Sequence, residues 1–93
     1  MSEVVKVHVI VSGKVQGVSY RHYTKQNASV NSISGWVKNN SDHTVAAVFQ
    51  GDIEDVREMI NWCWEGSPAS TVEGVKVDNL ESDQSFTGFE IKL

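Results

Sequence analysis

The sequence predicts an α+β fold in which two helices cover one face of an antiparallel sheet. Three observations point to it: valines alternate with other residues near the start, an amphipathic stretch lies in the middle, and the expected elements follow the order βαββαββ. The chain has 93 residues, which suits one domain over residues 1–93 with one small core.

The first strand is predicted over residues 4–11, where valine fills every second position from Val5 to Val11. β-Branched residues favour strands, and a period of two places these valines on one face. Lys6 and His8 fall on the opposite face. Such a mixed strand is typical of a sheet that is open to solvent on one side.

A loop over residues 13–21 joins this strand to a helix predicted from Tyr20 to about Asn31. Its two glycines allow tight bends with positive φ, so successive N–H groups can converge on one point as an anion-binding nest. The helix start adds unpaired N–H groups and a partial positive charge. Arg21 adds a permanent cation with a planar donor fork. The loop therefore predicts a cradle for phosphate or carboxylate.

Simpler or more common interpretations of this segment also exist. A glycine-bounded loop is often only a turn. Neither common nucleotide motif applies, because the loop lacks the Lys-Ser/Thr ending of a P-loop and the spacing of a dinucleotide fingerprint. The helix that follows has a weak apolar stripe, since Asn27, Ser29, Asn31 and Ser32 are poor helix formers.

The middle of the chain predicts a hairpin and a second helix. Strands over residues 34–39 and 44–50 flank a polar turn. Asp52 is a candidate N-cap for the helix, which ends at Gly66. The buried stripe of this helix is expected to comprise Ile53, Val56, Met59, Ile60 and Cys63.

Two further strands are predicted over residues 72–78 and 86–93. The resulting order is that of a ferredoxin-like split βαβ sandwich. In that arrangement the first and second strands run in the same direction with the third between them. The loop after the first strand and the end of the second then lie at one edge, about 10 Å apart.

The composition disfavours several classes of function. A formal net charge of -4 disfavours a general nucleic-acid binder, and no apolar run is long enough to span a bilayer. Cys63 is the only cysteine, and no signal peptide is evident, so we expect a reducing cytoplasm. We expect a monomer that needs no membrane or nucleic-acid partner.

Two strings carry a family resemblance. Residues 13–21, GKVQGVSYR, resemble the G-x-V-Q-G-V-x-F-R signature of the acylphosphatase family, with Tyr20 where Phe is usual. Residues 35–39, GWVKN, match the second motif, G-W-V-x-N. The chain departs from the pattern at Asn31-Ser32, at Asn40 and at Asp42-His43. The resemblance implies the same ferredoxin-like fold and a small hydrolase of acyl phosphates.

The resemblance also implies residue roles. It assigns Arg21 to the phosphate and Asn39 to the attacking water. The cradle is then expected to be lined by the peptide N–H groups of Val15, Gln16, Gly17, Val18, Ser19 and Tyr20. An acyl phosphate expels a carboxylate with a pKa of about 4, which departs without a proton. We therefore expect no cofactor and no metal, with an acyl phosphate as substrate and inorganic phosphate as product.

The sequence is also compatible with functions other than acyl phosphate hydrolysis. A non-catalytic anion-binding or regulatory module of the same fold would keep the cradle without turnover. An RNA-binding domain of this architecture would place aromatic residues on the open sheet face. A C-x5-R phosphatase is excluded because Ala69 stands where its arginine would be. The three histidines lie far apart in the sequence without ligand spacing, although His22 adjoins Arg21.

Overall fold

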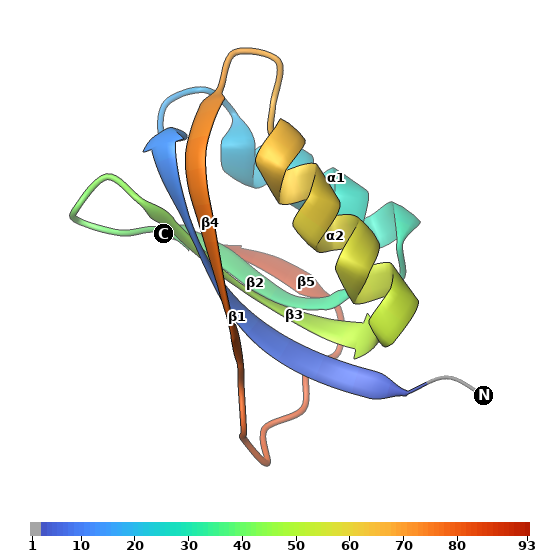
Figure 1. Cartoon of the computed structure of the whole chain (residues 1–93). Coiled ribbons are helices and arrows are strands. Elements are labelled where there is room, and N and C mark those ends of the chain that lie inside the picture. The colour runs from blue at the N-terminus through green and yellow to red at the C-terminus, as the bar shows by residue number, and fades with distance from the viewer. Residues whose placement is uncertain (1–2) are drawn as a thin grey trace.

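The computed structural model describes residues 3–93, so the first two residues of the predicted domain lie outside it. The elements follow in the order β1 (Val4–Lys14), α1 (Tyr20–Val30), β2 (Ser34–Asn39), β3 (Val45–Asp52), α2 (Ile53–Glu65), β4 (Thr71–Asn79) and β5 (Phe89–Lys92). Both helices lie over the same face of a five-stranded sheet, as Figure 1 shows. The predicted α+β sandwich is therefore confirmed.

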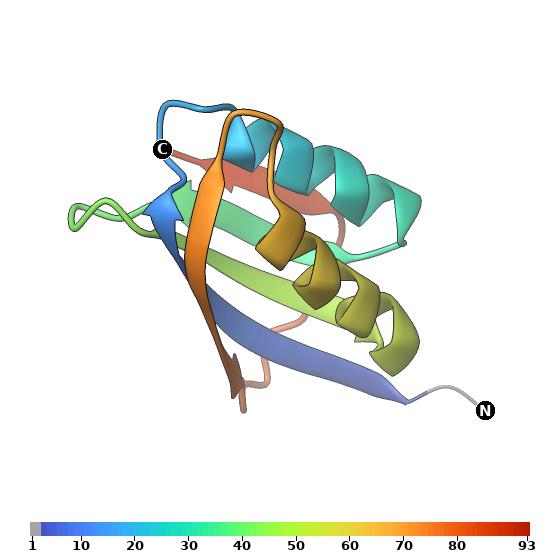
Figure 2. The ribbon, with the colours of Figure 1, turned by 45° about the horizontal axis from the view of Figure 1, so that its top comes forward.

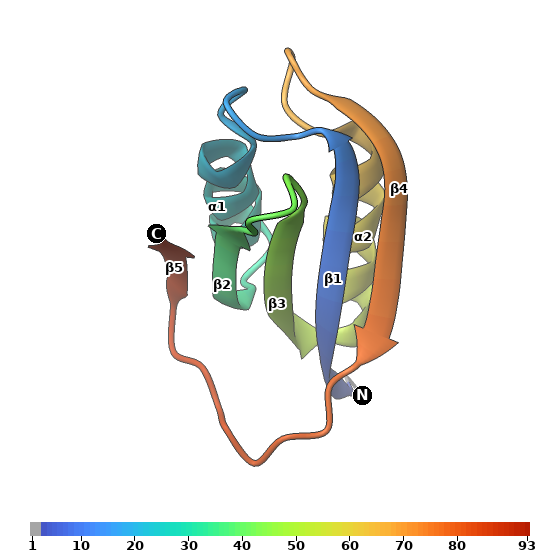
Figure 3. The same cartoon turned by 90° about the vertical axis from the view of Figure 1, so that its left-hand side faces the viewer.

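The strand order is β4-β1-β3-β2-β5, with β3 between β1 and β2 as predicted. Neighbouring strands are antiparallel except β2 and β5, which are parallel. The cause is the long connection over residues 80–88, which crosses one end of the sheet to the far edge (Figure 3). Because β5 starts from that end, it runs in the same direction as β2. The sheet is thus mixed at one edge instead of wholly antiparallel.

The strand boundaries of β1, β3, β4 and β5 differ from the prediction, most clearly at the end of β1 and the start of β5. β1 continues to Lys14, because a register shift at Ser12/Gly13 lets Gly13 and Lys14 pair with β4. β5 begins at Phe89 instead of residue 86. The backbone before it is bound elsewhere: the Phe86 N–H donates to Oε1 of Gln50 at 3.2 Å. Local pattern does not reveal either pairing.

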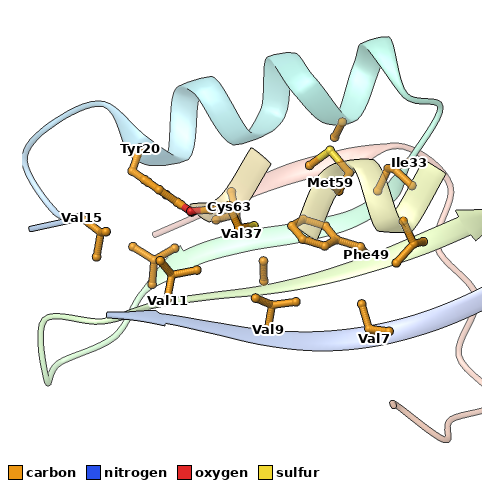
Figure 4. Packing of buried hydrophobic residues seen from close by; sticks show 14 residues of the cluster. Val7, Val9, Val11, Val15, Tyr20, Ile33, Val37, Phe49, Met59 and Cys63 are labelled. Atoms are coloured by element: carbon orange, nitrogen blue, oxygen red, sulfur yellow. The ribbon is translucent and has the colours of Figure 1, made fainter. Parts of the chain in front are cut away.

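The core fills the space between the sheet and the helices (Figure 4). From β1, Val7, Val9 and Val11 are buried, which confirms the alternation. The α2 stripe is also confirmed, with its central residues Val56, Met59 and Cys63 buried and its outer members half-buried. Burying such side chains contributes about 1.5–3 kcal/mol each, so this layer is the main source of stability.

The helices begin and end for local reasons. The Asp52 carboxylate accepts a hydrogen bond from the Glu54 N–H at 3.1 Å, as expected of an N-cap. The buried face of α1 is Tyr20, Thr24 and Ala28. Ala28 therefore supplies the buried contact in the last turn of α1.

No helix within residues 3–93 has the length and apolar character needed to cross a bilayer.

Candidate active site

The loop between β1 and α1 lies at one end of the molecule, near the β2–β3 turn and the end of β5 (Figures 2 and 3). Its backbone alternates in handedness: Gly17 has φ 74° and Ser19 has φ 61°, whereas Gln16 and Val18 stay outside the positive region. This alternation is the geometry in which successive N–H groups turn toward one side. A glycine adopts it without a Cβ penalty, and Ser19 does so at some cost.

The peptide donors of this loop are free of protein acceptors. Within residues 3–93, the N–H groups of residues 16–20 donate no hydrogen bond to the chain. Ser19 is also the N-cap of α1 and makes no side-chain cap bond. Free donors at a helix N-terminus attract anions, because the helix dipole adds partial positive charge at the same place.

Side chains hold the loop in shape where its own backbone does not. The Gln16 Nε2 group donates to the carbonyl oxygens of Asn40 at 2.8 Å and Thr44 at 2.9 Å. Ser67 Oγ, on the α2–β4 connection, donates to the Val18 carbonyl at 2.7 Å. Sequence reasoning named Gln16 and Val18 only for their peptide groups and missed Ser67, because nothing local marks contacts across 24 to 49 residues.

Tyr20 anchors the C-terminal end of the loop, where α1 begins. Its ring is buried and lies 5.1 Å from the Trp62 ring between centroids, and its hydroxyl donates to the Cys63 carbonyl at 2.8 Å. Burial raises the pKa of Tyr20 well above its usual range, so the phenol stays protonated and keeps donating. The hydroxyl that Phe would lack therefore ties the start of α1 to α2.

Asn39 ends β2 opposite Val45 of β3. Its Oδ1 atom is the one buried side-chain nitrogen or oxygen without a hydrogen-bond partner within residues 3–93. Leaving such an acceptor unpaired costs about 1–3 kcal/mol. Native proteins rarely keep that cost without a use, so the Asn39 amide is a candidate for a functional role.

Arg21 occupies the first turn of α1 and is half-buried. Its Nη1 donates to the Lys92 carbonyl of β5 at 3.1 Å. This bond fixes the guanidinium from one side and leaves its other N–H groups available. A guanidinium held this way offers the paired donors that suit a phosphate.

These groups surround one pocket of about 370 Å³, lined by Val15, Gly17, Ser19, Tyr20, Arg21, His22, Asn39 and Ile91. Six of the eight residues predicted for the site line it, including Arg21 and Asn39. Gln16 and Val18 are not among the lining residues. The predicted meeting of the two motifs at one sheet edge therefore occurs. Ile91 was not predicted, because β5 reaches this edge only through its parallel pairing.

The pocket carries positive charge and no carboxylate among its lining residues, so it suits an anion. His22 stands exposed at its rim, with its Nε2 atom 3.2 Å from Nε2 of Gln26. His8 lies on the open sheet face against the Trp36 ring, and His43 lies exposed in the β2–β3 turn. Within residues 3–93 no three His, Cys, Asp or Glu side chains gather as metal ligands.

Cys63 lies in the core and outside this pocket. Its side chain is 1% exposed, and burial raises the pKa of its thiol to about 12. At neutral pH the thiol is therefore protonated and inaccessible, which is the opposite of what a cysteine nucleophile needs. Trp64 is 52% exposed and Trp62 half-buried, in keeping with their position off the α2 stripe.

Known proteins that resemble this chain match it over nearly its whole length. The acylphosphatase family profile matches residues 7–91. An acylphosphatase of Pelotomaculum thermopropionicum is 44% identical over 86 residues, covering 92% of this chain and 94% of the relative. One of Natronomonas pharaonis is 45% identical over 92 residues, covering 99% of each.

Solved structures give the same result. An acylphosphatase from Coxiella burnetii superimposes with a TM-score of 0.91 at 32% identity, covering 96% of this chain and 93% of that one. The acylphosphatase from Bacillus subtilis gives 0.92 at 28% identity, covering 98% and 100%. The family profile, these relatives and the shared fold show that the chain belongs to the acylphosphatase family of enzymes.

Proposed function

We propose that the pocket between the β1–α1 loop and the end of β2 is where this enzyme hydrolyses acyl phosphates to a carboxylate and inorganic phosphate. Arg21 and the free peptide N–H groups of the loop hold the phosphate. Asn39 holds the attacking water. Acyl phosphate hydrolysis in general follows from the family, and the roles of Arg21 and Asn39 are what we propose for this chain.

One observation carries the proposal: the unpaired Oδ1 atom of Asn39 belongs to a residue that lines the same pocket as Arg21 and the free donors. Phosphate oxygens need donors, and a water that attacks phosphorus needs an acceptor for its hydrogens. The loop supplies donors on one side of the pocket, and the Asn39 amide lies on the β2 side. Such a division suits a phosphate and a water held in line.

The chemistry of the lining residues favours an anhydride over an ordinary phosphate ester. An ester expels an alkoxide, which usually needs an acid or a metal. Of the titratable groups here, the Tyr20 phenol is committed to the Cys63 carbonyl, and the exposed His22 ring meets Gln26. A carboxylate leaving group needs neither, because its pKa is about 4.

The proposed reaction proceeds in one displacement. The loop N–H groups and Arg21 neutralise charge that spreads over the non-bridging phosphate oxygens in a loose transition state. The water oxygen bonds to phosphorus as the bond from phosphorus to the acyl oxygen breaks. The carboxylate leaves with the electron pair, and the proton of the water ends on phosphate or in solvent. Asn39 orients the water without taking its proton.

The test uses benzoyl phosphate, whose hydrolysis is followed by its ultraviolet loss. Arg21→Ala is expected to lower kcat/KM by about 10³-fold and to abolish inhibition by phosphate, because it removes a cation from the transition state. Asn39→Ala is expected to lower kcat by a similar factor and to leave phosphate inhibition within about three-fold, since an amide that holds water is not needed to bind phosphate.

Lys25→Ala and Asn27→Ala are the matched controls, because they remove a charge and an amide from α1 outside the pocket. Both are expected to keep activity. Thermal melts confirm that all four variants fold. Full activity in folded Arg21→Ala or Asn39→Ala would contradict the assignment.

The proposal also covers the oligomeric state, the location and the cofactor requirement that the sequence predicts. The enzyme is proposed to act as a monomeric single domain in the cytoplasm without a metal or cofactor. One continuous buried cluster joins β1, β3 and α2, and a single cysteine allows no internal disulfide, which supports a reducing compartment. Dialysis against a chelator is expected to leave kcat unchanged, and loss of activity that Mg²⁺ or Zn²⁺ restores would contradict it.

A further inference from the structure

We propose that Gln16 is a positioning residue that sets the distance between the phosphate-holding loop and the strand end that carries Asn39. Gln16 is not among the residues that line the pocket, so it acts through its neighbours. The inference rests on the roles proposed above for the loop and for Asn39. It concerns how the β1–α1 loop and the end of β2 are held at a fixed distance from each other.

Strand pairing in the sheet does not by itself fix the distance between the loop and the end of β2. The pairing of β1 with β3 ends at Val11 opposite Val45, and the pairing of β2 with β3 ends at Asn39 opposite the same Val45. Beyond that row no ladder joins the loop to the β2–β3 turn. Among the side-chain hydrogen bonds within residues 3–93, those of Gln16 are the two that cross this gap.

The two bonds are made by one amide group and reach both sides of the turn. The Gln16 Nε2 group donates to the Asn40 carbonyl at 2.8 Å and to the Thr44 carbonyl at 2.9 Å. The peptide that joins Asn39 to Asn40 is held through the Asn40 N–H, which donates to the same Thr44 carbonyl that Gln16 bonds. This backbone bond measures 2.8 Å and closes the turn around the same point.

Such a connection matters because in-line attack is sensitive to small displacements. A misplacement of about 1 Å can cost about 10²-fold in rate. The phosphate is held by the loop and the water by Asn39, so a change in their separation moves the water relative to phosphorus. Binding of phosphate alone depends only on the loop side and should be insensitive to it.

The first experiment replaces Gln16 by methionine, which is similar in length and lacks the amide donor. Gln16→Met is expected to lower kcat on benzoyl phosphate about 10- to 100-fold. The inhibition constant of inorganic phosphate is expected to change by less than about three-fold, because the free loop donors remain. An unchanged kcat, or a phosphate inhibition constant that rises as far as kcat falls, would overturn the proposal.

The matched control is Ser67→Ala, which removes the other side-chain bond to the loop without touching the turn. Each change is combined with Asn39→Ala. Gln16→Met is expected to cause no further loss in that background, because the water it positions is already lost, whereas the effect of Ser67→Ala is expected to multiply. Multiplying losses for Gln16→Met would overturn the proposal and assign Gln16 to the loop alone.

A third variant adds a pH readout that general destabilisation would not give. In Gln16→Glu the carboxylate faces two carbonyl oxygens and cannot donate, so kcat relative to the original enzyme is expected to fall at least as far as in Gln16→Met. Protonation restores one O–H donor, so this ratio is expected to rise as the pH is lowered toward about 4. A ratio that stays flat or falls would count against the role.

These outcomes separate the two proposals. If Asn39→Ala alone keeps full activity, the proposed function fails and the role of Gln16 fails with it. If Asn39→Ala is inactive and Gln16→Met keeps its full kcat, only the role of Gln16 is lost.

Discussion

Two loops meet at the same end of the molecule and use their backbone in opposite ways. The β2–β3 turn, residues 40–44, bonds to itself: three of its five N–H groups donate within the turn, to the Thr44 carbonyl, the Asn40 carbonyl and the Asp42 carboxylate. The β1–α1 loop, residues 15–19, donates no backbone hydrogen bond from residues 16–19 to the described chain and is held by side-chain bonds, those of its own Gln16 and that of Ser67.

Unusual backbone conformation does not separate the two. His43 in the turn has φ 73°, and Ser19 in the loop has φ 61°. What differs is whether the donors are used. A turn that satisfies its own donors needs no ligand, whereas a loop held by side-chain bonds keeps its peptide donors for one. The following predictions test that distinction in order of expected effect.

The largest effect is expected at the cation beside the loop. Arg21→Lys keeps the charge and loses the planar fork, so kcat/KM on benzoyl phosphate is expected to fall about 10²-fold, equivalent to about 2.7 kcal/mol. Steady-state kinetics measures it, with Lys25→Arg as the reverse exchange on the same helix. An Arg21→Lys variant within about two-fold of the original would mean that charge alone is enough.

The next effect concerns the external support of the loop. Ser67→Ala removes the hydroxyl that donates to the Val18 carbonyl from a side chain that is 2% exposed. Losing a buried hydrogen bond is expected to lower the free energy of unfolding by about 1–3 kcal/mol. Urea denaturation measures this loss, and Ser41→Ala in the exposed turn is expected to cost much less. Equal losses would remove the distinction between the two loops.

Phosphate itself is expected to stabilise the folded protein through the loop. At ten times its dissociation constant it should add about 1.4 kcal/mol to the free energy of unfolding. Arg21→Ala should lose this gain, and a variant of the turn, Asp42→Asn, should keep it. Melting curves with and without phosphate measure the gain, and the opposite pattern would place the anion site in the turn.

The smallest effect is a pH dependence that comes from the turn. Hydrogen bonds from the Thr44 Oγ1 and N–H groups hold the pKa of the exposed Asp42 carboxyl below its usual value. A lowered folded-state pKa gives stability that is present above the unfolded-state pKa and lost as the pH falls through the folded-state pKa.

Asp42→Asn should therefore lower Tm slightly at pH 7, and the difference from the original protein should disappear in acid. Melting curves across that pH range measure it. A difference that grows in acid would contradict the sign.

Periodic burial made much of this structure predictable. The valines of β1 and the stripe of α2 repeat at the spacing of their elements, and those elements give the strand order that brings Arg21 and Asn39 to one pocket. Such patterns are local, so a single sequence contains them.

Other features depend on partners far along the chain. Ser67 meets Val18 across 49 residues, and Gln16 meets Thr44 across 28. The parallel entry of β5, which brings Ile91 to the pocket, depends on the path of residues 80–88. A short polar side chain or a polar connection looks the same in sequence whether it holds a site together or only faces water.

The openness of the loop has a consequence for turnover. Gly17 and Ser19 are exposed, and apart from the neighbours of Gly17 in the chain no heavy atom of residues 3–93 lies within 4 Å of the place that a Cβ on Gly17 would occupy. If the loop holds phosphate as proposed, we expect the product to leave into bulk solvent without a hinge or flap opening first. We therefore expect bond rearrangement at phosphorus to limit turnover, and thickening the medium with sucrose should leave kcat unaltered.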